Sequence, residues 1–445
     1  MDLKRDSLEI FWAGVKAVAP EEAVKAHLKR DGERLLVDGE ELDLGEVKRV
    51  VVVGAGKASA RMARAVEEIL GDRIEGGLIV VKDGHGVPLQ RVGVLEASHP
   101  VPDERGLEGA RRIVELLEGL SARDLAVCLI SGGGSALMPY PVEGITLEEK
   151  QATTEALLAS GATIHEVNAV RKHLSRTKGG RLALYAFPAR VLTLLISDVV
   201  GDDLDVIASG PTVPDRSTYG DALAVVDRYG LGESIPPRVL EVLRKGARRE
   251  IPETPKPGHG AFERVTNLVV ASNLQGLLAA KDKAKELGYN VLILSSMIEG
   301  ETRDVAKVHA GVLKEILKSG NPLPPPACII SGGETTVTIR GRGKGGRNQE
   351  FVLQAALEIA GWKGAAVFSA GTDGTDGPTE AAGAWADWKT VERAKELGLD
   401  PEAFLLDNDS YHFFKALGDL VITGPTGTNV MDLRILLASS SFDPS

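Results

Sequence analysis

Five turns of the chain combine glycine with serine, aspartate or lysine, and each follows a short apolar run. Glycine allows the backbone to turn sharply and to approach a ligand closely, and consecutive backbone amides can converge on one anion. A single such turn is equally well explained as a simple chain reversal, but five of them favour a shared ligand site. The turns are Gly54-Ala55-Gly56-Lys57, Ser131-Gly132-Gly133-Gly134-Ser135, Ser197-Asp198 with Gly201-Asp202-Asp203, Ser331-Gly332-Gly333-Glu334 and Ser369 to Gly374.

The first turn places a lysine at the start of an expected helix, where backbone amides favour an anion. It lacks the G-x-x-x-x-G-K-[ST] pattern of a P-loop. It matches half of the dinucleotide-binding pattern G-x-G-x-x-G, because Ser59 stands at the third glycine position, and Asp83 near the end of the next strand keeps a nicotinamide-dependent reaction open. Lys57 favours a phosphate, although by position alone it is more simply a solvated lysine.

The second turn and the most basic stretch of the chain both indicate an anionic ligand. The glycines from Gly132 to Gly134 can form a nest of amides. The segment 168–181 reads NAVRKHLSRTKGGR, and helical spacing places Asn168 and Arg171 on one face. A solvated charged helix would explain this run, but a cationic lining for an anionic substrate agrees with the other turns.

Acidic residues follow several of the same apolar runs. Carboxylates at strand ends beside phosphate-binding turns are typical Mg²⁺ ligands, so Asp198 and Asp376 are the candidate metal ligands, although a turn-forming role for Asp376 is a strong alternative. The stretch Gly345-Gly346-Arg347 precedes a helical segment. An arginine at a helix N-terminus can act on the charge of a transferring phosphoryl group.

The elements that must position these residues alternate between strand and helix. The apolar runs 50–53, 125–130, 191–196, 328–330 and 365–368 read as strands buried on both faces, and the segments 59–70, 103–120 and 280–287 have helical periodicity. This alternation predicts an α/β fold with parallel strands, which binds ligands at the carboxyl ends of its strands. A stretch rich in proline, glycine and charge at 234–260 predicts the domain boundary, giving domains 1–240 and 241–445, with room for the last segment to pack back on the first domain.

Composition excludes several classes of protein. The 445 residues hold 52 Lys and Arg against 63 Asp and Glu, a net charge of −11, which argues against nucleic-acid and membrane-surface binding. Two cysteines far apart, Cys128 and Cys328, argue against a disulfide framework and fit a reducing, cytoplasmic location. No apolar run is long enough to span a bilayer, and no G-x-S-x-G or H-E-x-x-H motif is present.

In combination, these motifs resemble those of the MOFRL-type glycerate kinases over nearly the whole chain. The resemblance is carried by Gly54-Ala55-Gly56-Lys57-Ala58, by the two Ser-Gly-Gly turns, by Asn168 to Gly180, by Ser197 to Asp202, by Gly345 to Glu350, by Gly371 to Gly383 and by Gly424 to Val430. It implies a larger Rossmann-like domain, a smaller C-terminal α/β domain and an active site in the interdomain cleft.

The resemblance also implies a transferase that uses ATP and Mg²⁺ to phosphorylate D-glycerate at its 2-hydroxyl. Phosphorylation at the 3-hydroxyl and an NAD(P)H-dependent hydroxypyruvate reductase stay open as alternatives, as does a homodimer. Lys57 and Arg347 are expected to be catalytic. The expected substrate- and nucleotide-binding residues are Gly54, Gly56, Ser131, Gly132, Gly133, Gly134, Ser135, Arg171, Asn273, Gly332, Gly333, Glu334, Asn348, Gln349, Thr372, Asp373 and Asn429.

Overall fold

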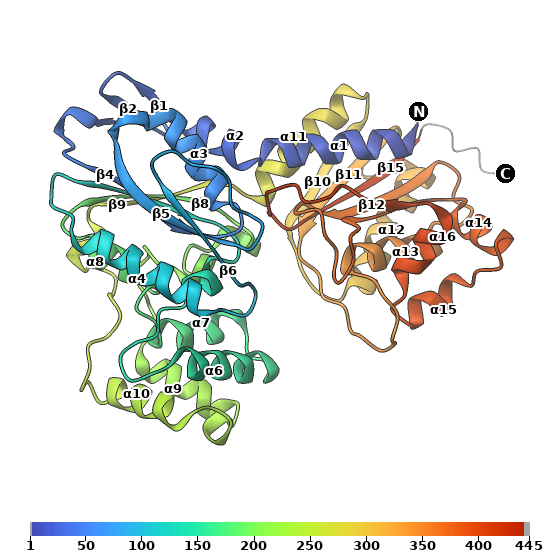
Figure 1. The fold of residues 1–445 in the computed structure, drawn as a ribbon. Helices are drawn as coiled ribbons and strands as arrows, with labels where there is room; N and C mark the ends of the chain where they lie inside the picture. Colours follow the sequence, from blue (N-terminus) through green and yellow to red (C-terminus); the bar gives the residue numbers. More distant parts are fainter. Residues whose placement is uncertain (1, 440–445) are drawn as a thin grey trace. The chain divides into compact units, whose positions relative to one another are not determined.

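The structure, a computed structural model, describes residues 2–439 and divides into two compact units (Figure 1). One unit is continuous, Pro20–Val270, and the other joins the first 19 residues to the chain from Ala271 onward. Each unit is built around its own six-stranded sheet, so the prediction of an α/β fold with a parallel sheet and a second α/β domain is confirmed.

The predicted domain limits of 1–240 and 241–445 differ from this division. The stretch at 234–260 lies inside the unit 20–270. It contains helix α10 (Pro237–Ala247), after which the chain adds strand β9 to the sheet of that unit. The expected return of the last segment to the first domain is also corrected: strand β15 lies between β11 and β12 of the second unit. Instead, the N-terminal helix α1 joins that unit by packing on α11.

The sheet of the unit 20–270 has the strand order of a Rossmann fold. Its order is β6-β5-β4-β7-β8-β9, and the pairings of β4 with β5 and β7, of β5 with β6 and of β7 with β8 are parallel. Strand order reverses between β4 and β7, and such a switch point is where open α/β sheets bind ligands. The strands are β4 (Val50–Ala55), β5 (Ile74–Lys82), β6 (Gly93–Ala97), β7 (Leu125–Ile130), β8 (Arg190–Ile196) and β9 (Val265–Ala271).

Helices cover this sheet and form an additional layer. Helix α4 (Glu104–Glu118) packs its apolar face into a core with β4, β5 and β7, and α3 (Ser59–Leu70) also packs on the sheet (Figure 1). Helices α6 (Leu147–Ala159), α7 (Ile164–His173), α9 (Tyr219–Arg228) and α10 enclose a separate apolar core. The remaining elements are α2 (Pro20–His27), α5 (Gly134–Leu137), α8 (Arg181–Ala186) and a three-stranded antiparallel sheet of β1 (Leu28–Asp31), β2 (Arg34–Val37) and β3 (Glu40–Asp43).

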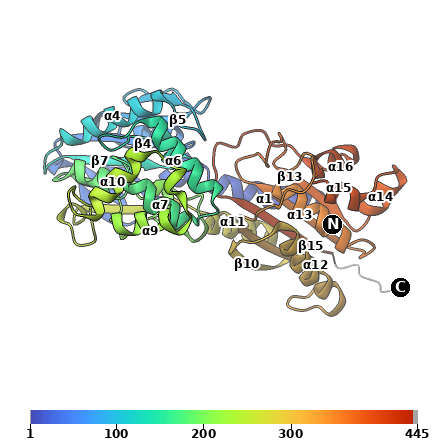
Figure 2. The same ribbon diagram turned by 90° about the horizontal axis from the view of Figure 1, so that it is seen from below.

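The other unit has a mixed sheet between two helical layers. Its order is β10-β11-β15-β12-β13-β14. Among these described strands, the pairing of β10 with β11 is parallel and the other four pairings are antiparallel. Helices α1 (Leu3–Ala17) and α11 (Asn273–Glu286) share one apolar core, and α12 (Thr302–Ser319) and α13 (Arg347–Glu358) share the other (Figure 2). The strands are β10 (Asn290–Ile298), β11 (Ala327–Gly333), β12 (Ala365–Gly371), β13 (Gly383–Asp387), β14 (Leu420–Val421) and β15 (Asp432–Ala438), and the last helices are α14 (Thr390–Glu396), α15 (Pro401–Leu406) and α16 (Ser410–Leu417).

Local sequence signals fix where the site-bearing helices begin. Helices α6 and α7 each start with a capping box, formed by Thr146 with Glu149 and by Thr163 with Glu166. In the part of the chain that the structure describes, no helix combines the length and apolar character needed to cross a membrane. Both cysteines are free and buried, as expected for a chain without a disulfide framework.

Candidate active site

The turns after β4 and β7 lie side by side at the switch point. The backbone N–H of Lys57 donates to the carbonyl of Gly132 over 2.9 Å, and the N–H of Ala58 donates to Oγ of Ser131 over 3.0 Å. Within residues 2–439, the Lys57 side chain forms neither a hydrogen bond nor an ion pair. The structure therefore brings together the predicted lysine and the predicted glycine-rich turn, and it leaves the ammonium group for a ligand.

Two further polar side chains face the same turn. Gly132 lies so close to Asp198 that a Cβ atom there would overlap the carboxylate unless the aspartate side chain moved. Gly133 has a φ of +85° and lies against the imidazole of His99. Burial, followed by repulsion from Lys57, lowers the pKa of His99 to about 4, so this imidazole is neutral at physiological pH. Asp198 is the residue predicted at this turn, and His99, for which a structural role was the simpler expectation, adds an imidazole to it.

Arg171 reaches the end of the same turn from α7. Its Nη2 donates to Oγ of Ser135 over 2.6 Å, and Ser135 is linked through Ser209 to the side chain of Asn168. Asn168 and Arg171 therefore share one face, as their spacing predicts. Arg171 lies in the last turn of α7, where positive charge is favourable for the helix dipole.

Two buried lysines lie close to Ser135 and Arg171: Lys178, from the predicted basic stretch, and Lys150, which was not predicted. Lys178 Nζ donates to the carbonyl of Ser135 over 2.6 Å, and Lys150 Nζ is buried without a hydrogen-bond partner in the described chain. A signal for Lys150 was present, because it lies on the buried face of α6 with Leu147 and Leu157. A lysine on an apolar helical stripe is unusual enough to indicate a special role.

The second polar region surrounds Arg347, in the unit that contains the mixed sheet. Its guanidinium donates twice to Asp432, with Nε–Oδ2 at 2.7 Å and Nη2–Oδ1 at 3.0 Å, and once to Oε1 of Glu334 at 2.5 Å. These carboxylates hold the pKa of Arg347 above its ordinary value despite burial. The sequence predicted Arg347 and Glu334, and the structure brings them into contact.

Asp432 and Arg434, which the sequence analysis missed, complete this region. Asp432 is fully buried and also accepts from Arg434 and from the side-chain amide of Asn348. Arg434 is itself 1% exposed. Both residues lie on β15. Their alternation with Leu433 and Ile435 predicts a strand, but it does not indicate that Asp432 will bind Arg347.

Asp376 has a structural partner set that sequence alone did not reveal. Its two oxygens accept from the backbone N–H groups of Asn348 and Gln349 over 3.0 and 2.9 Å and from the side-chain amides of the same two residues. The carboxylate therefore caps the N-terminus of α13. Burial raises the pKa of Asp376 to about 6. Because four donors already occupy its oxygens, this geometry favours capping over the predicted metal binding.

Three other predicted binding residues support one short segment. Asn273 donates to the carbonyls of Val430 and Asp432, and Thr372 donates to the carbonyl of Met431. Asn429 Oδ1 accepts from the N–H of Met431 over 3.1 Å, so it turns the same segment internally. Gly332 lies against the side-chain amide of Asn273, as Gly132 of the other unit lies against the carboxylate of Asp198. Gly333 has a φ of +102°, and Gly133 likewise has a positive φ, of +85°.

Asp373 forms a local turn, with Oδ1 accepting from the N–H of Thr375 over 3.0 Å. Among the described residues, no group of three or more histidine, cysteine, aspartate or glutamate side chains is arranged to hold a metal ion. A Mg²⁺ ion bound mainly by substrate phosphates needs only one or two carboxylates. Asp198 fits that more modest requirement, since it lies beside the glycine-rich turn.

The acidic residue expected for a dinucleotide-binding site is already bound by another side chain. Both oxygens of Asp83 are engaged by Arg105, over 2.7 and 2.9 Å. Ser59, at the third glycine position, bonds through its hydroxyl to Ser131 over 3.2 Å. In a dinucleotide-binding site the acidic residue would hold a ribose hydroxyl, so the geometry around β4 favours another ligand.

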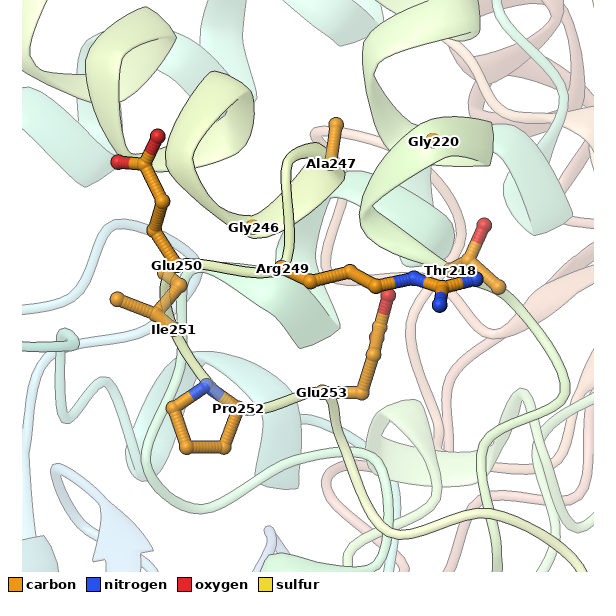
Figure 3. A pocket seen from close by; sticks show the side chains of 9 residues that line it. All are labelled: Thr218, Gly220, Gly246, Ala247, Arg249, Glu250, Ile251, Pro252 and Glu253. Atoms are coloured by element: carbon orange, nitrogen blue, oxygen red, sulfur yellow. The ribbon is translucent and has the colours of Figure 1, made fainter.

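The open pocket in Figure 3 contains none of the predicted residues. Arg249 extends across it toward Thr218, and Glu253 points toward Arg249 (Figure 3). The carboxylate of Glu253 binds the ring of His173 over 3.0 Å and the N–H of Tyr219 over 2.9 Å. This pocket therefore borders the supporting structure of α7 and α9.

Comparison with known proteins gives consistent matches over the chain. A model described as "Domain of unknown function (DUF4147)" matches residues 6–244, and the MOFRL family model matches residues 327–432. The chain is 45% identical to a D-glycerate 2-kinase of Thermotoga maritima over 439 residues, 97% of this chain and 98% of that protein. It is also 48% identical, over 87% of each chain, to an Agrobacterium vitis protein provisionally named hydroxypyruvate reductase. A crystal structure of glycerate kinase from Thermotoga maritima is similar with a TM-score of 0.87 and 43% identity, covering 98% of this chain and 99% of that one.

Proposed function

The chain belongs to the MOFRL-type glycerate kinase family, and on that premise we propose that it transfers the γ-phosphoryl group of ATP to the 2-hydroxyl of D-glycerate, giving 2-phospho-D-glycerate and ADP. The single observation that best supports this chemistry is the group of cations around the Ser131–Ser135 turn. Lys57, Arg171 and Lys178 have no carboxylate partner in the described chain. Both proposed substrates are anions that would supply the missing negative charge.

The proposed mechanism relies on positioning and on charge stabilisation, because phosphoryl transfer requires little covalent participation by the protein. Lys57, whose ammonium group forms no hydrogen bond or ion pair within residues 2–439, neutralises charge on the transferring phosphoryl group. The Ser131–Ser135 turn holds an anionic substrate group through its backbone amides. Arg347 is assigned to the same step, with Glu334 and Asp432 fixing the orientation of its guanidinium.

Mg²⁺ is part of this proposal as a partner of the nucleotide. When bound, the ion would neutralise negative charge on the phosphates. Asp198 is the carboxylate that we assign to it, for its place beside Gly132. Asp376 is a weaker assignment, because α13 already occupies its oxygens.

A coupled assay of ADP release tests the proposed function directly. Adding D-glycerate to the protein with ATP and Mg²⁺ should release ADP at a rate well above the rate without D-glycerate. A parallel assay follows NADH and NADPH oxidation with hydroxypyruvate, which addresses the alternative suggested by the name of the Agrobacterium vitis relative. Substrate-dependent oxidation without ADP release would overturn the kinase assignment.

Phosphorus NMR of the product tests the position of transfer. The 2- and 3-phosphates of glycerate differ in the coupling of phosphorus to the protons of the adjacent carbon, because one carbon is a CH group and the other a CH₂ group. A doublet is expected for 2-phospho-D-glycerate. A triplet would instead assign the reaction to the 3-hydroxyl.

A double-mutant cycle tests whether Lys57 and Arg347 serve one step. If both stabilise the same transition state, the loss in kcat for the double variant is smaller than the product of the two single losses. Strictly multiplicative losses would assign the two residues to separate steps. The location of the active site between the two domains stays a prediction.

We also propose a homodimer, for which the edge of the mixed sheet is the supporting observation. Strand β10 stands at that edge, and within residues 2–439 no strand pairs with its outer side. It carries Leu294 and Met297 as exposed side chains and contains no charged residue. Long apolar edges of this kind favour pairing with another chain. Light scattering during size exclusion should give a dimer mass for the wild type and a monomer mass for Leu294→Lys; a wild-type monomer would contradict the proposal.

The absence of nucleic-acid binding and the cytoplasmic location stay predictions.

A further inference from the structure

Two buried lysines, Lys150 and Lys178, and the partly buried Arg171 lie close enough for charge repulsion between them, and within residues 2–439 none of the three forms an ion pair with a carboxylate. Lys150 is 6% exposed and Lys178 is 1% exposed, and Arg171 is partly buried. Arg171 donates to the hydroxyl of Ser135, and Lys178 donates to its carbonyl. Within residues 2–439, the charge of each group is opposed only by burial and by the other cations.

Two donors in this cluster also lack an acceptor. Lys150 Nζ and Asn168 Nδ2 are buried and have no hydrogen-bond partner among the described residues. The other end of the Asn168 amide is fixed, because its oxygen accepts from Ser209, which in turn contacts Ser135. A buried donor without an acceptor is costly, and an uncompensated buried charge is more costly still. Negatively charged oxygen atoms would satisfy both deficits.

The neighbouring Lys172 shows how this chain treats a buried lysine that serves structure. Lys172 is also 1% exposed, but it forms ion pairs with Asp205 and with Asp215 at 3.5 Å. In this chain, a buried lysine with a structural role is therefore paired with carboxylates. In the part of the chain that the structure describes, Lys150 forms no ion pair or hydrogen bond through its Nζ, and this distinguishes the two positions.

We propose that Lys150, Arg171 and Lys178 form a binding site for an anionic oxygen group of a substrate, either the carboxylate of D-glycerate or a phosphate of the nucleotide, and this assignment rests on the proposed function. Ser135 and Arg171 are the partly exposed members of the site, and Lys150 and Lys178 are its buried members. Burial and the adjacent cation Arg171 lower the pKa of Lys150 to about 7 when the anion is absent. An anion at the site favours the protonated form of Lys150, so the charge of the site adjusts to its ligand.

The principal test compares steady-state kinetics of the wild type with Lys150→Met and Lys178→Met. Methionine approximates the length of lysine without its charge. Each variant should raise the KM of the same substrate by about thirtyfold or more, the effect of removing one partner of a buried charge pair, and leave the other KM within about threefold. A rise in the KM for D-glycerate identifies the carboxylate, and a rise in the KM for ATP identifies a phosphate. If both KM values stay within threefold in Lys150→Met, or if the two variants affect different substrates, the inference is overturned.

Thermal unfolding provides the control for a merely structural role. Lys150→Met should unfold at the wild-type temperature or above it, because it removes an uncompensated buried charge. The matched variant Lys172→Met should unfold at a lower temperature, because it leaves Asp205 and Asp215 without their cation. An equal fall in Lys150→Met would show that Lys150 has a structural partner and would overturn the inference.

Calorimetric binding separates failure of this inference from failure of the proposed function. D-Glycerate, ADP and inorganic phosphate are titrated separately into the wild type and into Lys150→Met. Should the wild type release no ADP with D-glycerate yet bind one of these probes at least tenfold more tightly than Lys150→Met, the function fails and the anion site stands. Should the wild type turn over D-glycerate while both proteins bind all three probes equally, the function stands and the anion site fails.

Discussion

The two polar regions of this protein treat charge in opposite ways. Around Ser135, the cations Lys57, Lys150 and Lys178 have no carboxylate partner in the described chain. Around α13, Arg347 is held by Glu334 and by the buried Asp432. The first region therefore has charge left for a ligand, whereas the second uses its charge to fix the position of its own groups.

The difference follows from the cost of burying charge. An isolated buried ion is unstable unless a partner compensates it, and the protein supplies that partner only in the second region. Removing one member of a compensated pair leaves the other uncompensated, which is strongly destabilising. Removing an uncompensated cation has no such penalty. Substitution of a cation in the first region should therefore lower activity without lowering stability. Substitution of Arg347 in the second region should lower both.

The largest expected effect is on turnover. Lys57→Met and Arg347→Met should each reduce kcat by about 10³-fold or more, as for other cations that stabilise a transferring phosphoryl group. Only Arg347→Met should also lower the unfolding temperature, because it leaves Asp432 without its bidentate partner. ADP release and thermal denaturation measure the two effects. If Arg347→Met unfolds like the wild type, the contrast between the regions fails.

A large effect on stability is expected for Asp432→Asn. This change removes the charge that Arg347 and the buried Arg434 share, so the free energy of unfolding should fall by about 3–5 kcal/mol. The matched control is Glu334→Gln, whose side chain is 44% exposed and should contribute under about 1 kcal/mol. Urea denaturation measures both. Equal losses would mean that burial of Asp432 does not matter.

A smaller effect is the pH dependence of stability that Lys150 causes. The pKa of Lys150 is about 7 in the folded chain and near 10.5 when unfolded, so the unfolded chain binds more protons between these values. The wild type should therefore lose stability relative to Lys150→Met as the pH falls from about 10 to 7, with no further change below. Urea denaturation at pH 7, 8, 9 and 10 measures this difference. The exposed Lys29→Met variant should show no such slope, and a flat difference for Lys150→Met would contradict the assignment of an uncompensated charge.

The smallest effect is expected for Asp83→Asn. Its carboxylate forms an exposed ion pair with Arg105. Exposed pairs contribute little, so kcat and both KM values should equal those of the wild type. Steady-state ADP release checks this expectation. A marked rise in the KM for a nucleotide would restore the dinucleotide-type role of Asp83.

Most of the scaffold could be predicted because its signals are local. The run 125–130 is strand β7 with the predicted limits, and 59–70 is helix α3 with the predicted limits. Buried strands are continuous apolar runs, and helices repeat their apolar positions, so both are readable along the chain. The domain limits were not readable, since α1 packs on α11 across more than 250 residues of intervening sequence.

The candidate site was only partly predictable. Lys57 and Arg171 follow from their place near glycine-rich turns, and the structure places both at the switch-point turns. Asp376 was predicted as a candidate metal ligand, with a turn-forming role as the alternative. No local signal indicates which N–H groups will contact its carboxylate, and in the folded chain four donors from α13 do so. Asp432 was missed because its partner Arg347 is 85 residues away in sequence.

The sequence by itself determined the α/β fold and the family, and it predicted anion binding at the turns, because these depend on residue type and on spacing over a few positions. Only the tertiary structure decided which charges are compensated. Lys150 and Lys172 are both lysines of helices in the same unit, and nothing local distinguishes them. Lys172 forms ion pairs with two aspartates, whereas Lys150 has no ion-pair partner among the described residues and lies near the cation Arg171. Compensation depends on which side chains converge in space, and that follows from packing between distant segments.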